Sequence, residues 1–470
     1  MPSETDDGLL KTLSVRDTLV LGFGAMIGWG WIILSGTWID LGGPLGTIVA
    51  FVIGGLMVGL IALLYAELAS AMPLVGGEHV YSLRALGPIG AFVTTWAIIF
   101  GHVSVAAFEA VALPSAVSFL LPGFDVMQLW SVAGQPVYAT WVLTGVLGTA
   151  VITYLNYRGI RPAAQFQFIM TVVIALAGAV LVAGAVGRGA PSPDPAFTAG
   201  TAGIFAVVLQ TPFMFVGFNV IPQSAEETNI PARSLGIVIV LSVLMAMIFY
   251  IAVIWGASRA LSGAQLVDST LPAAAAMAEL FDSRTIGQLM ALAGVAGILT
   301  SWNAFLIGGS RAIFALAQSG MLPRSLAKIH PEYNTPSNAI VLVGTLSALA
   351  PLFGETMLTW IVNAGGLGIV TAWLMVAISF LVLRRREPTL DRPYEVPAGR
   401  VVGVAGLLLA AFFVYLYLPG GQSALAWPYE WAIVFLWVAL GVVLLSVSEG
   451  YDEERVEVAK RKLNELEDSA

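Results

Sequence analysis

The chain alternates long apolar stretches with short polar ones, and this pattern predicts its architecture. Twelve stretches carry little or no charge, and most are long enough to cross a bilayer as a helix of about 20 residues. They lie near residues 17–38, 44–70, 88–113, 137–156, 162–186, 201–221, 234–257, 286–308, 338–353, 358–383, 401–419 and 428–447. The pattern therefore predicts an all-α polytopic membrane protein with twelve transmembrane helices.

The first and sixth stretches contain residues that interrupt a helix. The first has glycines at positions 22, 24, 28 and 30, and the sixth has Pro212, Gly217 and three polar residues between 210 and 219. Non-helical backbone at membrane depth is tolerated only where protein buries it or where it lines a cavity. We therefore expect breaks near 27–30 and 210–219, which is typical of a transporter site built from inverted repeats. For the glycines, the alternative is close helix packing.

Composition excludes a soluble protein. Of 470 residues, 58% are hydrophobic and 11% are charged, with a mean hydropathy of +0.87, whereas about a quarter of the residues in soluble domains are charged. The absence of cysteine excludes disulfides, thiolate metal sites and cysteine nucleophiles. Phosphate-binding loops and an ATP-binding domain are missing, so neither an ATPase partner nor nucleic acid is expected. The polar start of the chain favours no cleavable signal.

The distribution of Lys and Arg predicts the orientation. With the N-terminus inside the cell, all 21 of these residues except Arg188, Arg259 and Arg284 fall in inward-facing segments, as the positive-inside rule requires. This predicts a multi-pass protein of the cell membrane with cytoplasmic termini. Residues 1–16 are expected to be an N-terminal tail, 17–447 the membrane domain, and 448–470 a charged cytoplasmic helix. Outer loops are expected at 187–199 and, with a short helix, at 257–285.

Four motifs resemble the amino acid–polyamine–organocation superfamily, and they follow its order from about Leu13 to Pro397. They are residues 24–30 (GAMIGWG), 65–69 (YAELA) with 73–81 (PLVGGEHVY), 215–219 (FVGFN) with 225–227 (AEE), and 310–317 (SRAIFALA) with 322–336. The resemblance implies the leucine-transporter fold and alternating access. Its five-plus-five inverted repeats would span about 17–187 and 200–386, with broken helices 1 and 6, and two peripheral helices would follow at about 401–447.

The resemblance also implies a substrate site at the two breaks. Backbone amides near Gly28 would receive a substrate carboxylate, carbonyls near Met26 would receive an α-amino group, and Phe213 would form an aromatic lid. The residues implied in binding are Met26, Gly28, Trp29, Gly30, His102, Phe213, Val216, Gly217 and Asn219. Two of them depart from the family pattern. The bulky Trp29 would narrow the site or turn outward, and Asn219 is neutral where many relatives carry Asp or Glu.

A sodium site between the first and eighth stretches is implied by the same resemblance. Its five oxygen ligands would come from Gly24, Ile27, Gly297, Thr300 and Ser301, and hard cations prefer such ligands. In some proton-coupled relatives a lysine from the fifth stretch takes this place, but residues 162–187 contain none. The alternative is that the two hydroxyls bond back to their own helix. No other cofactor is expected.

Ionisable residues at membrane depth are candidates for function because their burial is costly. His102 would face the substrate, or would bond to a neighbouring helix as a neutral side chain. Glu109, two turns further out, is a gating or proton-carrying candidate, or part of a structural pair. Glu226 and Glu227, with Arg233 close by, are expected to hold a gate or a helix end together.

These features predict a secondary active transporter, not an enzyme, that imports a small neutral amino acid or a related zwitterionic amine, coupled to sodium. Proton symport and amine exchange on the same fold are the alternatives. A non-transporting sensor and a membrane enzyme are more distant, because the three histidines are widely separated. The expected partners are the amino acid and the lipid bilayer, and the sequence leaves the oligomeric state open.

Overall fold

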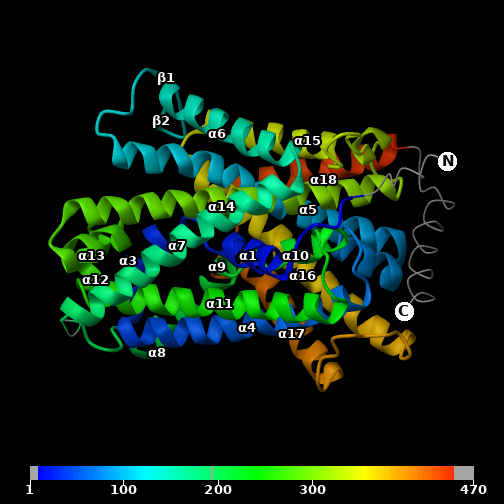
Figure 1. Ribbon diagram of the computed structural model, residues 1–470, viewed down its shortest axis with the longest axis horizontal. Coiled ribbons are helices and arrows are strands. Elements are labelled where there is room, and N and C mark those ends of the chain that lie inside the picture. Colours follow the sequence, from blue (N-terminus) through cyan, green and yellow to red (C-terminus); the bar gives the residue numbers. More distant parts are fainter. Residues whose placement is uncertain (1–8, 191, 193, 449–470) are drawn as a thin grey trace.

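The computed structural model describes residues 9–190, 192 and 194–448. It is an elongated bundle in which most helices run along the long axis (Figure 1). The predicted tail 1–16 is described only from residue 9 onward, and nearly all of the predicted charged helix 448–470 lies outside the described residues.

Nine helices of the described chain are long and apolar enough to cross a membrane. They are α4 (Pro44–Ala71), α5 (Glu78–Leu120), α6 (Ala139–Tyr157), α7 (Ile160–Arg188), α11 (Ala232–Ser258), α14 (Arg284–Gln318), α16 (Thr356–Arg386), α17 (Gly399–Tyr417) and α18 (Tyr429–Val447). Each overlaps one of the apolar stretches, which confirms a polytopic helical membrane protein. The arrangement of twelve spans in two inverted repeats stays a prediction.

The first predicted span is broken, as expected. It consists of α1 (Val15–Met26), α2 (Gly30–Ile33) and α3 (Ser35–Gly42), and the three residues between α1 and α2 belong to no helix. A capping box at Ser14 starts α1, because the Ser14 hydroxyl and a carboxylate three residues later satisfy each other's backbone N–H groups. The glycines near Met26 therefore coincide with a real interruption.

The sixth predicted span is also broken. It consists of α8 (Gly200–Val208), α9 (Thr211–Met214) and α10 (Val220–Gln223), and its longest interruption is 215–219. Gly217 there has a φ of 143°, a conformation that L side chains rarely adopt. A Cβ at this position would lie 2.8 Å from the backbone of the last residues of α1. Glycine thus lets the two breaks touch.

The ninth predicted span is short. Its helix α15 (Ser337–Leu349) is continued by the 3-10 turn η3 (Ala350–Phe353), and two further 3-10 turns are η1 (Ala225–Glu227) and η2 (Arg324–Ala327). A length of 17 residues places this segment below the nine long helices. The apolar stretch at 338–353 therefore corresponds to a helix, although not to one of membrane-spanning length on its own.

The connections contain one element that the sequence pattern did not predict. The predicted loop at 257–285 holds two short helices, α12 (Gly263–Val267) and α13 (Pro272–Phe281). Between α5 and α6, however, lies an antiparallel hairpin of β1 (Gln128–Val132) and β2 (Gln135–Tyr138). Its two-residue turn at 133–134 has positive φ at both positions, the geometry that two-residue hairpins favour.

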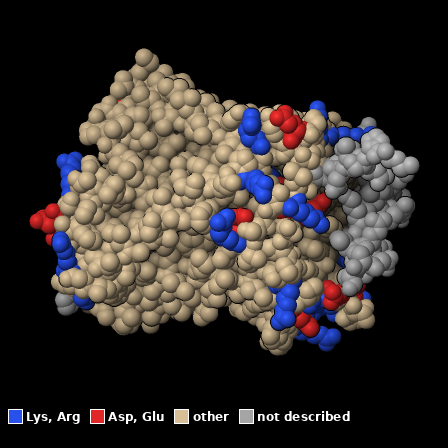
Figure 2. All heavy atoms as spheres, in the orientation of Figure 1, with Lys and Arg blue, Asp and Glu red and all other residues tan. Residues whose placement is uncertain are grey.

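Charged side chains are unevenly distributed along the long axis. On the face in Figure 2 they lie at the left-hand edge and across the right-hand half, with a broad, almost uncharged band between these two groups. A central band without charge is what a bilayer core requires, because a charged group there costs several kcal/mol. The surface therefore agrees with a membrane domain.

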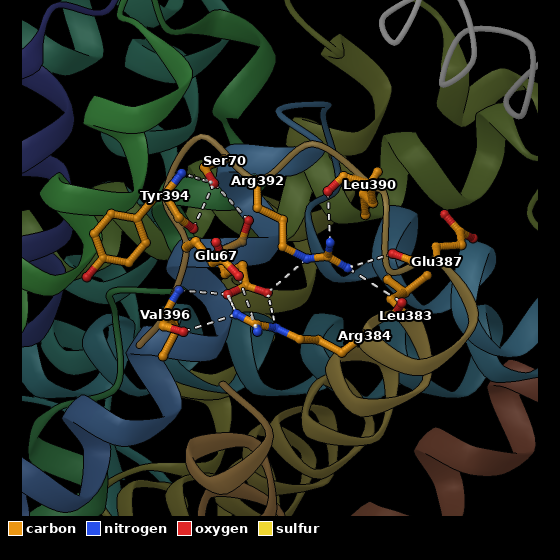
Figure 3. Close-up of polar contacts among 10 residues, drawn as sticks. Glu67, Ser70, Leu383, Arg384, Glu387, Leu390, Arg392, Tyr394 and Val396 are labelled. Carbon is orange, nitrogen blue, oxygen red and sulfur yellow. Dashed lines mark hydrogen bonds and ion pairs between the residues drawn. The ribbon is translucent and has the colours of Figure 1, made fainter. Parts of the chain in front are cut away.

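A buried carboxylate fastens the segment after α16 to α4 (Figure 3). Glu67 is only 1% exposed, and Arg384 pairs with it through Nε at 2.8 Å and also through Nη2. Arg392 Nε lies 3.1 Å from the same carboxylate, and the backbone N–H of Val396 donates to it at 2.8 Å. Every oxygen of this carboxylate is thus engaged by segments far apart in the sequence.

Glu67→Gln is expected to lower the free energy of unfolding by about 3 kcal/mol, because it leaves two partly buried guanidinium groups without their counter-charge. The measurement is unfolding of the purified protein in detergent. Glu395→Gln is the matched control, because Glu395 lies 3.5 Å from Arg384 but is 67% exposed, and exposed pairs contribute little. Equal stability of the two variants would contradict the assignment.

Candidate functional site

The two helix breaks border a cavity of about 420 Å³, a volume within the usual range for small-molecule sites. Its walls come from the α1–α2 break, the middle of α5, α9 and the residues after it, α11, α14 and the first turns of α16. The breaks thus lie together at one cavity, as the pattern of glycine and proline indicated.

One wall of the cavity is backbone with free donors. The N–H groups of Gly28, Trp29 and Gly30 have no hydrogen-bond acceptor within the described part of the chain. A Cβ on Gly28 would lie 2.8 Å from Glu109 Oε1 and 3.3 Å from Ser301 Oγ, so a larger side chain at this position would be too close to both side chains. Unpaired N–H groups in the wall of a cavity can receive the oxygens of an anion such as a carboxylate.

Tyr250 of α11 joins the two breaks. Its hydroxyl lies 2.8 Å from the Met26 carbonyl and 3.2 Å from the Met214 carbonyl, and it donates to this pair. The Met26 carbonyl, expected to bind an α-amino group, therefore already has a protein donor. Sequence reasoning missed Tyr250; the available signal was a single phenol in the middle of an otherwise apolar stretch.

The remaining walls are mostly apolar. Phe213 and Val216 line the cavity as expected, and Phe108 and Phe305 add aromatic walls that were not predicted. Among the described residues that line it, the charged side chains are Glu109 and Glu355, and none is Lys or Arg. The cavity thus offers apolar surface and acidic groups to a ligand, but no cationic side chain.

Trp29 lines the cavity and leans on α14. It is buried, and a Cβ on Gly294 would lie 2.5 Å from its ring and 2.7 Å from Ile32. The ring therefore occupies a site that only glycine leaves open. Trp29 was expected either to narrow the site or to turn outward; it lines the cavity, and its ring also packs against α14.

His102 lies outside the cavity, contrary to the expectation that it faces the substrate. Its Nε2 is 3.0 Å from Asn219 Nδ2, and the Gly217 N–H donates to Asn219 Oδ1 at 3.2 Å. Because Oδ1 is the acceptor of that pair, Nδ2 must donate to His102, whose ring is then neutral with its proton on Nδ1. His102 and Asn219 hold the second break in place, which is the alternative role considered for the histidine. Asn219 does not line the cavity either.

The residues expected to bind sodium lie near one another where α1 meets α14, and a sodium site there stays a prediction. The Thr300 hydroxyl donates to the Gly297 carbonyl of its own helix at 2.9 Å, and Ser301 also lines the cavity. A Cβ on Gly297 would lie 3.0 Å from the Ile27 carbonyl, so α14 approaches the break closely here. Gly24 does not line the cavity; it lies beside Gln167 and Thr171 of α7 and beside Thr300 of α14.

The expected gating residues are close to one another, but the pairing differs. Glu227 pairs with Arg311 through two contacts of 2.8 and 2.9 Å, and both side chains are fully buried. Glu226 accepts a hydrogen bond from the Val75 N–H at 3.2 Å. Arg233, expected near these carboxylates, is exposed and has no ion pair within the described residues. The ion pair ties α14 to the segment after α10.

Comparisons with known proteins agree over nearly the whole chain. Residues 13–443 match the family described as amino acid permease. A branched-chain amino acid permease of Bacillus subtilis (strain 168) is 29% identical over 87% of this chain and 88% of its own length. A methylthioribose transporter of that organism is 27% identical over 93% of both chains, and its aspartate-proton symporter is 23% identical over 89% of this chain and 81% of its own length.

Proposed function

The chain belongs to the amino acid permease family, and from this premise we propose that it imports a small neutral amino acid by alternating access. A transport function for an amino acid follows from the family, and a membrane-embedded, non-enzymatic role agrees with it. The choice of a neutral substrate and the mechanism are the proposal, together with the cell membrane as its location.

One observation carries the choice of substrate. The cavity combines three free backbone N–H groups at the α1–α2 break with walls that contain no Lys or Arg among the described residues. The N–H groups are suited to an α-carboxylate. A second carboxylate on the side chain would find no counter-charge and would be costly to bury. Acidic amino acids are therefore disfavoured.

The apolar walls favour an aliphatic or aromatic side chain. Phe108, Phe213 and Phe305 surround the space that a substrate side chain would occupy. Val216 and other carbonyl groups of the second break remain as acceptors for the α-amino group, because Tyr250 already donates to Met26 and Met214. The name of one relative, the branched-chain amino acid permease, agrees with such a substrate.

Alternating access requires barriers at both ends of the cavity. The cavity reaches the first turns of α16, including Thr359, whereas the buried Glu227–Arg311 pair lies two turns beyond Phe305 along α14. On the predicted orientation, the ion pair is the cytoplasmic barrier and the start of α16 is the outer one. Movement of the two inverted repeats against each other would open one barrier while the other is closed.

Glu109 is the ionisable group best placed for coupling. Its Oε1 lies against Gly28, at the free N–H groups, and its Oε2 has no hydrogen-bond partner within the described residues. A carboxyl group there can exchange a proton with the site as substrate binds or leaves. We assign it this role, as an alternative to the sodium coupling that the sequence favoured.

Ligand-dependent stabilisation of the purified protein tests the proposed substrate. Leucine or phenylalanine is expected to raise the unfolding temperature, because a ligand at about 100 times its Kd stabilises by about 2.7 kcal/mol. 3-Methylbutylamine, which is leucine without its carboxylate, is expected to have no effect at the same concentration. Aspartate is a second control. Equal stabilisation by leucine and the amine, or by aspartate, would contradict the proposal.

A further inference from the structure

Two buried polar groups of α7 meet α1 at Gly24 without a partner. A Cβ on Gly24 would lie 2.5 Å from Gln167 Nε2, 2.8 Å from Thr171 Oγ1 and 3.4 Å from Thr300 Cβ. The Gln167 and Thr171 side chains are 1% and 6% exposed, and neither of these two atoms has a hydrogen-bond partner in the described residues. A buried amide donor without an acceptor is costly, so its retention calls for an explanation.

The orientation of the Gln167 amide is determined by its neighbours. Asn156 Nδ2 donates to the Ile152 carbonyl at 3.0 Å and to Asn303 Oδ1 at 2.8 Å. Asn303 Nδ2 donates to the Ala163 carbonyl at 3.2 Å and to Gln167 Oε1 at 2.8 Å. Because backbone carbonyls only accept, each amide can point in one direction only. The Gln167 N–H2 group must therefore point towards α1.

This donor does not fit the expected sodium ion. A sodium ion needs a shell of oxygen atoms, and an amide N–H2 group presents hydrogens to the space beside Gly24. The Gly24 Cβ position that lies 2.5 Å from Gln167 Nε2 is also 3.4 Å from Thr300 Cβ, so this donor sits where α1 and α14 meet. The residues present thus disagree with a sodium site between α1 and α14.

Acceptors for the Gln167 donor lie on α1 itself. The carbonyls of Gly24 and Ala25 receive no hydrogen bond among the described residues, because the helix stops before donors four residues later can reach them. The Gly24 carbonyl belongs to the residue whose Cβ position lies 2.5 Å from Gln167 Nε2. A hydrogen bond from Gln167 to such a carbonyl can therefore stabilise one position of α1 without any ion.

We propose that the Gln167 amide takes the place of a coupling cation and positions α1, so that transport does not depend on sodium. This rests on the proposed transport function. Asn156 and Asn303 hold the amide in its orientation, and Gly24 provides the space for it. A neutral donor fixed to α7 carries no charge across the membrane, so the driving force must come from protons or from exchange of substrate.

Sodium alone is the first probe, because it needs no substrate. The unfolding temperature of the purified wild-type protein is expected to be the same in sodium chloride and in choline chloride of equal concentration. Gln167→Glu replaces the amide by a carboxylate of the same shape, close to the unpaired carbonyls of α1. This variant is expected to gain stabilisation that is specific to sodium. A merely structural role would not produce that gain. Saturable stabilisation of the wild type by sodium, or an unchanged ion response of Gln167→Glu, would overturn the proposal.

Leucine uptake into proteoliposomes is the second probe. Wild-type uptake in choline buffer is expected to equal that in sodium buffer. Gln167→Leu is expected to slow uptake about tenfold, because it removes the amide beside α1 together with the buried hydrogen bond from Asn303. Gln165→Leu is the matched control, because Gln165 is exposed on the same helix. A requirement for sodium, or normal uptake by Gln167→Leu, would overturn the proposal. Lack of uptake under every condition would instead contradict the transport function, while the sodium probe still decides this inference.

Discussion

Gly28→Val is expected to reduce uptake of the substrate by at least about hundredfold, because the side chain would displace the carboxylate from two or more charge-assisted hydrogen bonds. A Cβ on Gly28 already lies 2.8 Å from Glu109 Oε1 and 3.3 Å from Ser301 Oγ. The branched methyl groups would therefore fill part of the cavity wall that Gly28 shares with Glu109 and Ser301. Binding, measured by stabilisation with leucine, should be lost together with uptake.

Gly59→Val is the matched control for this substitution. Gly59 lies in α4, and a Cβ there would meet no atom within 4 Å. Its variant should therefore keep uptake close to that of the wild type despite the same change of residue. Wild-type uptake by Gly28→Val would contradict the placement of the carboxylate at the α1–α2 break.

Arg311→Met is expected to lower the free energy of unfolding by about 3 to 5 kcal/mol, because it leaves Glu227 as an unpaired buried charge. Both side chains of this ion pair are 0% exposed, so water cannot replace the lost partner. Unfolding in detergent and the yield of folded protein measure the effect.

A double variant separates the missing charge from poor packing. Arg311→Met combined with Glu227→Leu removes both charges, and replacement of a whole buried pair by apolar residues is often close to neutral. The double variant should therefore be more stable than Arg311→Met alone. If Arg311→Met were as stable as the wild type, the ion pair would not be what holds α14 to the segment after α10.

The sequence predicted the long helices and both breaks because their signals are local. An uncharged stretch of membrane length and a cluster of glycines can be recognised without knowing any tertiary contact. The hairpin at 128–138 was missed because it is short and lies almost entirely outside the apolar stretches. The stretch at 338–353 was predicted as a full span, whereas its helical segment at 337–353 is shorter than the nine long helices, because hydropathy alone does not give the length of a helix.

The site was predicted less completely because its contacts join distant parts of the chain. The register of a helix did not reveal that His102 faces Asn219, 117 residues away, rather than the cavity. Proximity in sequence favoured Arg233 as the partner of Glu227, but the fold supplies Arg311, 84 residues away. Such pairings depend on how helices pack, and a single sequence does not contain that information directly.

Gln167 illustrates the same limit within one helix. The absence of lysine from the fifth apolar stretch was read as favouring sodium, while Gln167, one of three polar residues in that stretch, was passed over. Its importance depends on Asn303 of α14, which fixes the direction of its amide. A buried glutamine in an apolar stretch is a signal that could have been used.

Uptake of radiolabelled amino acids into proteoliposomes tests the central claim most directly. The panel contains leucine, phenylalanine, alanine, arginine and aspartate, each without a gradient, with an inward proton gradient, with an inward sodium gradient and with internal substrate. We expect saturable uptake of neutral amino acids, driven by protons or internal substrate and indifferent to sodium. Uptake no greater than that of empty liposomes throughout the panel, or uptake of aspartate in preference to leucine, would contradict the account.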